Sequence, residues 1–162
     1  PTPSFCYGLN ICLEYKNFDL TMFWQGVQGV DVISDLKKET DLWSGLNIGF
    51  LNKGKRVLDA WSPTNPNSTI PALSRSDTNN EKRVSTYFVE NGSFLKLRNI
   101  QLGYNVPKNF AQKMKMERLR FYLSAQNVFT IKSKEFTGVD PENANYGYPI
   151  PMNITFGINV GF

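Results

Sequence analysis

Carboxylates and cysteines are the side chains that could do chemistry in this sequence, because none of its 162 residues is a histidine. Histidine is the commonest general base and the commonest transition-metal ligand, so most catalytic triads and zinc sites are excluded. Glu14 and Asp19 are the one pair of carboxylates expected to face each other, and they lie beside a tight turn instead of across a cleft. A hydrolase that uses this pair is therefore disfavoured, and we expect no catalytic residue and no enzyme activity.

The two cysteines offer no disulfide. Cys6 and Cys12 fall on the same face of a predicted strand, but they lie roughly 20 Å apart at about 3.3 Å per residue. That distance excludes a disulfide within the strand, and two cysteines alone do not make a zinc site. We expect both to be unpaired.

The remaining carboxylate groupings have structural explanations. Asp140 and Glu142 in GVDPEN could bind calcium, but a turn built on Asp-Pro is favoured. The helical spacing of Asp31, Asp35 and Glu39 predicts a solvated helix face. We expect neither a bound metal nor a cofactor.

The charge balance limits the partners. Eighteen Lys and Arg residues against fourteen Asp and Glu residues give a net charge of +4. The basic stretch KNFAQKMKMERLR (108–120) is short and isolated, which favours a solvated turn over a nucleic-acid surface. We therefore expect no nucleic-acid partner. The chain begins with Pro1 instead of Met, which suggests a processed chain or a fragment.

The elements that position these side chains are strands with one apolar face. The terminal NITFGINVGF alternates strictly, and only a strand places all of its apolar side chains on one side. SFCYGLNICLEY (4–15) is apolar at odd positions and FDLTMFWQ (18–25) at even ones. A two-residue hairpin between them pairs Tyr15 with Phe18 and Leu13 with Leu20, which keeps one face apolar.

We predict five strands, at about 4–15, 18–28, 94–104, 118–129 and 152–162. A phase change in FLKLRNIQLGY predicts a β-bulge near Arg98 and Asn99, and Pro107 is placed to open a short helix. The loops at about 29–93 and 130–151 are long. Within the first, KGKRVLDAW could form one or two helical turns that place Val57, Leu58 and Trp61 on one side.

Strand length and loop length together indicate a membrane barrel. Strands of about ten or eleven residues cross a bilayer at a tilt, whereas strands of soluble sheets are more often five or six residues long. Short turns at one end, long loops at the other and aromatic residues at both strand ends are typical of outer-membrane barrels. We therefore predict an all-β fold of antiparallel transmembrane β-barrel strands with long extracellular loops. The alternative is a soluble β-sheet module that binds carbohydrate, which explains the aromatic residues but not the strand lengths.

Several segments together resemble the C-terminal part of SusC-type (RagA-like) TonB-dependent transporters of Bacteroidetes. The resemblance lies in YGLNICLEYKNFDLTMFWQGVQG, DAWSPTNPNSTIPAL, ENGSFLKLRNIQLGYNVP, LRFYLSAQNVFT, GVDPEN and YGYPIPMNITFGINVGF, and it covers nearly the whole chain. Met152 and Ala72 depart from it, because the family often has arginine at both positions.

The resemblance implies a barrel of about 22 strands in the cell outer membrane, crossing it many times, with an N-terminal plug. This chain would supply the last five strands, and the plug would lie outside it. The resemblance also implies TonB-dependent uptake of glycans or peptides. The transporter would work together with a SusD-like lipoprotein, and TonB-ExbB-ExbD would energise the uptake. Other implied partners are membrane lipid and the barrel-assembly machinery.

Candidate site residues are therefore binding surfaces. The candidates for contact with substrate or lid, which could equally anchor the loops, are Trp43, Trp61, Tyr146 and Tyr148. The residues expected to face the lumen or plug, where ordinary wetted lumen is the plainer interpretation, are Glu14, Asp19, Gln101, Arg120, Ser124, Gln126, Thr155 and Asn159. The resemblance assigns the barrel-assembly signal to Phe156, Ile158, Val160 and Phe162.

Overall fold

The computed structural model describes the chain except for residues 1, 43–51, 75–79, 81–82 and 145–146. It divides into two compact units. The sheet unit comprises residues 2–30, 93–133 and 150–162, and the loop unit comprises the described parts of 31–92 and 134–149.

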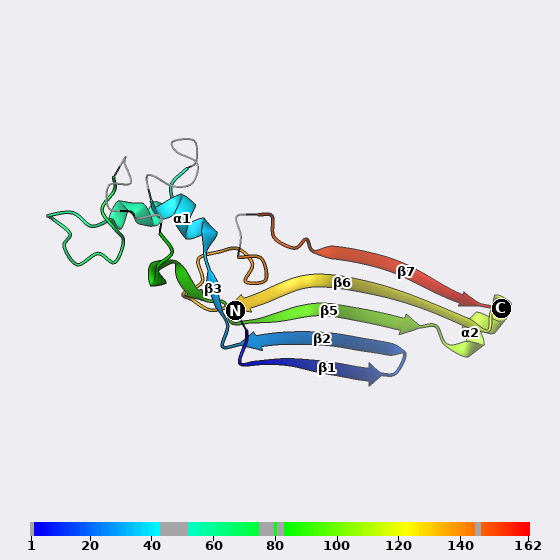
Figure 1. Ribbon diagram of the computed structural model, residues 1–162. Coiled ribbons are helices and arrows are strands. Elements are labelled where there is room, and N and C mark those ends of the chain that lie inside the picture. Colours follow the sequence, from blue (N-terminus) through cyan, green and yellow to red (C-terminus); the bar gives the residue numbers. More distant parts are fainter. Residues whose placement is uncertain (1, 43–51, 75–79, 81–82, 145–146) are drawn as a thin grey trace. The chain divides into compact units, whose positions relative to one another are not determined.

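The sheet unit is one antiparallel five-stranded sheet in the order β1-β2-β5-β6-β7 (Figure 1). Strands that are adjacent in the sheet are also consecutive along the chain within this unit. The strands are β1 (Phe5–Tyr15), β2 (Phe18–Gln28), β5 (Phe94–Asn105), β6 (Arg118–Lys132) and β7 (Asn153–Gly161). β6 extends three residues beyond the predicted position 129.

The register of the β1–β2 hairpin is as predicted. Tyr15 pairs with Phe18 and Leu13 with Leu20. Lys16, the first residue of the turn, has φ 54°, the left-handed conformation that the tight hairpin requires there. The alternating pattern therefore sets both the pairing and the common apolar face.

The predicted β-bulge is also confirmed. The β5–β6 register shifts between Leu97 and Asn99, and the β2–β5 register shifts at Phe23 and Trp24. The extra residue, Arg98, changes the phase of the strand, so that Leu97 faces the same side as Ile100.

The β5–β6 connection contains the short helix α2 (Lys108–Lys113) directly after Pro107, as the sequence predicts. Ala111 is buried on it. The Val106 amide donates to the Leu119 carbonyl and the Glu117 amide to the Gly161 carbonyl, at 2.9 Å each. These two bonds fix the connection to the ends of β6 and β7.

The loop unit contains more regular structure than its composition suggests. Its elements are β3 (Asp31–Ile33), α1 (Asp35–Asp41), the 3₁₀ helices η1 (Lys55–Asp59) and η2 (Thr86–Phe88), and β4 (Val89–Asn91). β3 and β4 pair as a small antiparallel ribbon. No helix in the described part of the chain is long and apolar enough to cross a membrane.

Two expectations for this unit are wrong. Asp31, Asp35 and Glu39 do not share a solvated helix face, because Asp31 lies in β3 and Glu39 is only 4% exposed. Val57 and Leu58 do not lie on one side, because Val57 is buried while Leu58 is 87% exposed.

Candidate functional site

One face of the sheet is apolar and open. The register places its side chains in continuous rows, such as Leu13–Leu20–Leu102–Leu123–Phe156 across all five strands. Leu102 and Leu123, on inner strands, are 47% and 50% exposed. The other large apolar side chains exposed on this face are Phe5, Tyr7, Leu9, Tyr15, Phe18, Phe129, Ile131, Ile154, Ile158 and Val160. Within the described residues nothing covers this face, although a sheet in water normally buries its apolar side.

The opposite face carries the polar residues expected there. Gln101, Ser124 and Thr155 form one row with Thr21, and Arg120 pairs with Asn159 two rows further along the same face. The same register places Glu14 beside Asp19, and Gln126 beside Asn99 and Asn153. The strands therefore bring together all eight residues predicted to share a face.

An ion pair crosses three strands of this polar face. Arg120 on β6 donates from Nη2 to Asp19 Oδ2 on β2 at 2.5 Å and from Nε to Oδ1 at 3.4 Å. Asn105 Nδ2 donates to the same Oδ1 at 3.1 Å. Both charged side chains are less than one-fifth exposed. Gly103 on the strand between them makes room, because a Cβ there would lie 2.5 Å from both partners.

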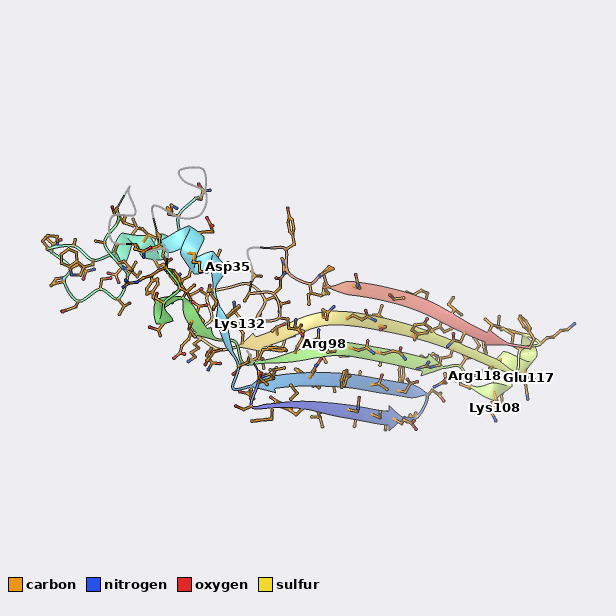
Figure 2. The ribbon with its side chains drawn as sticks, viewed as in Figure 1. Asp35, Arg98, Lys108, Glu117, Arg118 and Lys132 are labelled. Carbon is orange, nitrogen blue, oxygen red and sulfur yellow. The ribbon has the colours of Figure 1, made fainter. Side chains whose placement is uncertain are left out.

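This ion pair borders a polar cavity of about 320 Å³ at the short-turn end of the sheet. It is lined by Glu14, Lys16, Phe18, Asp19, Asn105, Arg118 and Arg120. Arg118, Glu117 and Lys108 all lie at this end of the sheet (Figure 2). The lining contains three cations and two carboxylates, which suits a charged or hydrogen-bonding protein segment better than an apolar ligand.

The terminal strand presents three of the four signal candidates, Phe156, Ile158 and Val160, on the apolar side. Phe156 is 65% exposed and its ring stacks on Phe121 at a centroid distance of 6.5 Å. Ile158 and Val160 follow on the same face, and Phe162 after the strand end is 87% exposed. These side chains are available to a partner or to lipid.

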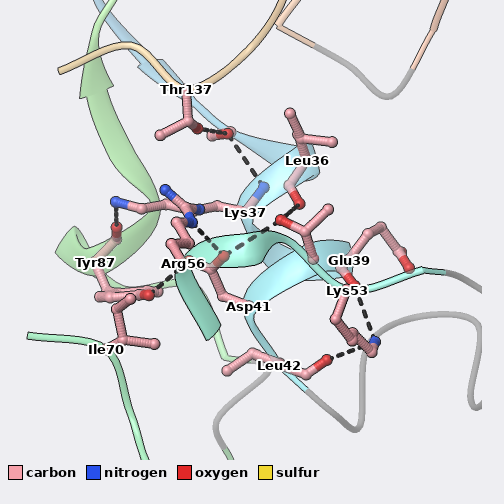
Figure 3. Close-up of polar contacts among 12 residues, drawn as sticks. Leu36, Lys37, Glu39, Asp41, Leu42, Lys53, Arg56, Ile70, Tyr87 and Thr137 are labelled. Atoms are coloured by element: carbon pink, nitrogen blue, oxygen red, sulfur yellow. Dashed lines mark hydrogen bonds and ion pairs between the residues drawn. The ribbon is translucent and has the colours of Figure 1, made fainter. Parts of the chain in front are cut away.

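A buried charge cluster holds the loop unit together (Figure 3). Asp41, 1% exposed, accepts from Arg56 Nε at 2.5 Å and from the Tyr87 hydroxyl at 2.7 Å. Burial raises the pKa of the Tyr87 phenol, and its hydrogen bond to Asp41 raises that pKa further. The phenol therefore stays protonated and acts as a donor to the carboxylate.

A second buried carboxylate links three segments of the same unit. Glu90 on β4 accepts from the Thr137 amide at 3.0 Å and from the Thr137 hydroxyl at 2.8 Å, and it lies 3.5 Å from Lys37 Nζ on α1. The Ser34 hydroxyl caps α1 by accepting from the Lys37 amide at 3.3 Å. Sequence reasoning missed this cluster, because its contacting members are 3 to 103 residues apart and no periodic pattern connects them.

An open pocket of about 400 Å³ lies in the loop unit. Its lining consists of Leu36, Gly138, Val139, Asp140, Asn143, Gly147, Tyr148 and Pro149. Tyr148 is 96% exposed. Trp61, 45% exposed, does not line this pocket, so the structure does not bring these two aromatic candidates together there. The other two, Trp43 and Tyr146, lie outside the described residues.

The Asp-Pro turn is formed as predicted. Asp140 Oδ1 accepts from the Glu142 amide at 3.1 Å, and the Asn143 amide donates to the Asp140 carbonyl at 3.0 Å. Among the residues that the structure describes, no three His, Cys, Asp or Glu side chains are grouped to hold a metal. Cys6 and Cys12 are both unpaired and exposed.

Comparison of sequences relates the chain to TonB-dependent receptors. No family model matches the chain. The TonB-dependent receptor P3 of Formosa agariphila is 34% identical over 178 residues, which cover 100% of this chain and 17% of that protein. The TonB-dependent receptor SusC of Bacteroides thetaiotaomicron is 31% identical over 170 residues, covering 100% of this chain and 15% of that protein. The chain thus spans about one-sixth of the length of the curated relatives it matches.

Comparison of structures gives a similar result. A chain of the RagAB peptide importer in its closed-closed state superposes with a TM-score of 0.81 and 28% identity, over 99% of this chain and 17% of the other. The same importer in its open-open state gives a TM-score of 0.78 and 27% identity over the same shares.

Proposed function

Because the chain belongs to the SusC-like TonB-dependent receptors and matches their C-terminal part, we propose that the complete protein imports a nutrient across the outer membrane. Its sheet is an antiparallel segment of the barrel wall, open because the chain is a fraction of the barrel. Import would be energised through TonB-ExbB-ExbD, outside this chain.

The observation that carries the proposal is the division of the sheet into two faces. The apolar face is exposed even on inner strands, and β1 and β2 each have eleven residues, the length of a tilted transmembrane strand. In our proposal this face contacts lipid, and the polar face with Asp19 and Arg120 faces the lumen and plug. A soluble carbohydrate-binding module would leave the apolar face in water, so we do not favour that alternative.

The long loops would lie outside the cell and meet a SusD-like lipoprotein and the substrate. Support comes from the similarity to the RagAB peptide importer. Within this chain the candidate contacts are Tyr148 at the loop pocket and the exposed Trp61, together with Trp43 and Tyr146. The substrate class we propose is an oligosaccharide or a peptide, because an aromatic ring beside Asp140 and Asn143 suits either.

Uptake assays with the full-length protein test this proposal. A strain that lacks the gene would be supplied with fluorescent oligosaccharide and peptide pools, with and without dissipation of the proton gradient. We expect the parent gene to restore energy-dependent uptake of one pool. Tyr148→Ala should reduce that uptake, while Leu58→Ala, an exposed loop change away from the pocket, should not. Uptake that is unaffected by deletion of the gene, or by loss of the gradient, would contradict the proposal.

A further inference from the structure

The short-turn end of the sheet gathers four lysines from two connections. Lys16 lies in the β1–β2 hairpin, and Lys108, Lys113 and Lys115 lie in the α2 connection. The Asn105 amide donates to the Asn17 carbonyl at 2.8 Å, which holds the two connections at the same end. All four lysines are exposed, and within the described residues none forms an ion pair.

The α2 helix and its C-cap residue Met114 together form an amphipathic turn. At 100° per residue, Phe110, Ala111 and Met114 fall within an arc of about 100°. Ala111 is buried, whereas Phe110 and Met114 are 59% and 54% exposed. Lys108 and Lys113 flank this arc, each about 60° beyond its edge. The apolar side chains thus protrude between two cations.

Aromatic residues separate this surface from the apolar face of the sheet. Tyr15 and Phe18 end the hairpin strands, and Phe18 packs on Tyr104 at a centroid distance of 4.8 Å. Lys16 Nζ lies 5.2 Å from the Tyr15 ring centroid. Along the strands the order is aliphatic, then aromatic, then cationic, which matches the passage from hydrocarbon through the interface to headgroups.

We propose that the α2 connection and Lys16 form a binding surface for anionic phospholipid headgroups. Lys108, Lys113 and Lys115 bind the headgroup phosphate, and Phe110 and Met114 enter the outer part of the acyl region. Residues 106–117 carry three lysines and one glutamate, a net charge of +2. This positive charge complements the phosphate of an anionic phospholipid, whose headgroup has no ammonium group to neutralise it. This inference rests on the membrane location in the proposed function.

The test uses the full-length protein in phosphatidylethanolamine vesicles, with Phe110→Trp as a reporter. Equal fractions of brominated phosphatidylglycerol or brominated phosphatidylethanolamine serve as quenchers, and the fluorescence of the parent protein is subtracted. We expect stronger quenching by the anionic lipid, since each lysine near an anionic surface contributes about fivefold. Changing Lys108, Lys113 and Lys115 to Gln should abolish the preference, while the matched change to Arg should preserve it.

Other results would overturn the inference. Equal quenching by both lipids would mean that the lysines do not select anionic headgroups, and no quenching would mean that α2 does not reach lipid. Relief of quenching by free glycerophosphoglycerol or inorganic phosphate would indicate a site for soluble anions instead. Trp24 pairs with Leu9 on the apolar face of the sheet, and its quenching is the difference between the parent protein and Trp24→Phe. This quenching reports separately whether the sheet lies in lipid. If Trp24 is not quenched, the proposed function itself fails.

Discussion

At the scale of single residues, neighbours in β7 have opposite surroundings. Ile158 pairs with Phe121 on the apolar face, and Asn159 pairs with Arg120 on the polar one. Each side chain's environment follows from its parity, because strand side chains alternate. Charge tolerance should therefore alternate in the same way.

We predict that Ile158→Arg destabilises the full-length barrel by about 2–4 kcal/mol, the range for a cation near the midplane on the lipid side. Asn159→Arg should be much less damaging in a barrel prepared without the plug, because a cation in the lumen stays hydrated. Folding titrations in lipid vesicles measure both, with and without the plug. The assigned register is wrong if Asn159→Arg is the more damaging change in the plug-free barrel.

Gly103 is the second residue with a defined consequence. A methyl group there would displace Arg120 or Asp19, 2.5 Å away, and separate a pair whose side chains are largely buried. We expect Gly103→Ala to lower the free energy of unfolding of the full-length protein by about 1.5–3 kcal/mol, the contribution of hydrogen bonds to charged groups.

Gly161→Ala is the matched control for Gly103→Ala, because its new Cβ would lie 3.5 Å from its nearest neighbour, in ordinary contact. The two variants are compared by urea unfolding of protein in detergent micelles. Equal loss in both would show that the effect belongs to glycine replacement in a strand and not to the Asp19–Arg120 pair.

At the scale of elements, the sequence predicts the features that depend on residues near one another in the chain. It does not predict the features that depend on partners far away in the chain. The hairpin register and the bulge at Arg98 follow from alternation and from its change of phase. The burial of Asp41 does not, because Arg56 and Tyr87 lie 15 and 46 residues away. The burial of Glu39 does not follow either, because helical spacing does not show which side of a helix is packed. The pocket around Tyr148 likewise joins α1 to residues 138–149.

The buried carboxylate of Asp41 makes the loop elements testable as a unit. Tyr87→Phe removes one of its donors and leaves Asp41 Oδ2 without that bond, which should cost about 1–3 kcal/mol of local stability. Hydrogen exchange of residues 31–42 and 83–92 in the full-length protein should accelerate. Tyr148→Phe is the control, because it removes a hydroxyl from a side chain that is 96% exposed. In this variant, hydrogen exchange of residues 31–42 and 83–92 should stay at the parent rate. No acceleration in Tyr87→Phe would mean that the cluster does not hold α1 in place.

At the scale of the whole molecule, the chain combines a sheet that has an open apolar face and a polar face with an internal ion pair, and loops that have their own packed core. A soluble sheet of this size would bury one face against another layer, and none is present among the described residues. A segment of barrel wall explains the exposed face, the length of the strands and the extent of the similarity to RagAB together.

In our proposal the two faces of β7 meet different solvents. After Cys6 and Cys12 are replaced by serine, single spin labels would be placed at Ile154, Thr155, Phe156, Ile158 and Asn159 of the full-length protein in vesicles. Collision rates with oxygen, which dissolves in lipid, and with a water-soluble nickel chelate would then be measured at each position. We predict opposite alternation of the two collision rates. Oxygen should be favoured at Ile154, Phe156 and Ile158, and the chelate should be relatively favoured at Thr155 and Asn159. High chelate access at all five positions would contradict it, because both faces would then lie in water.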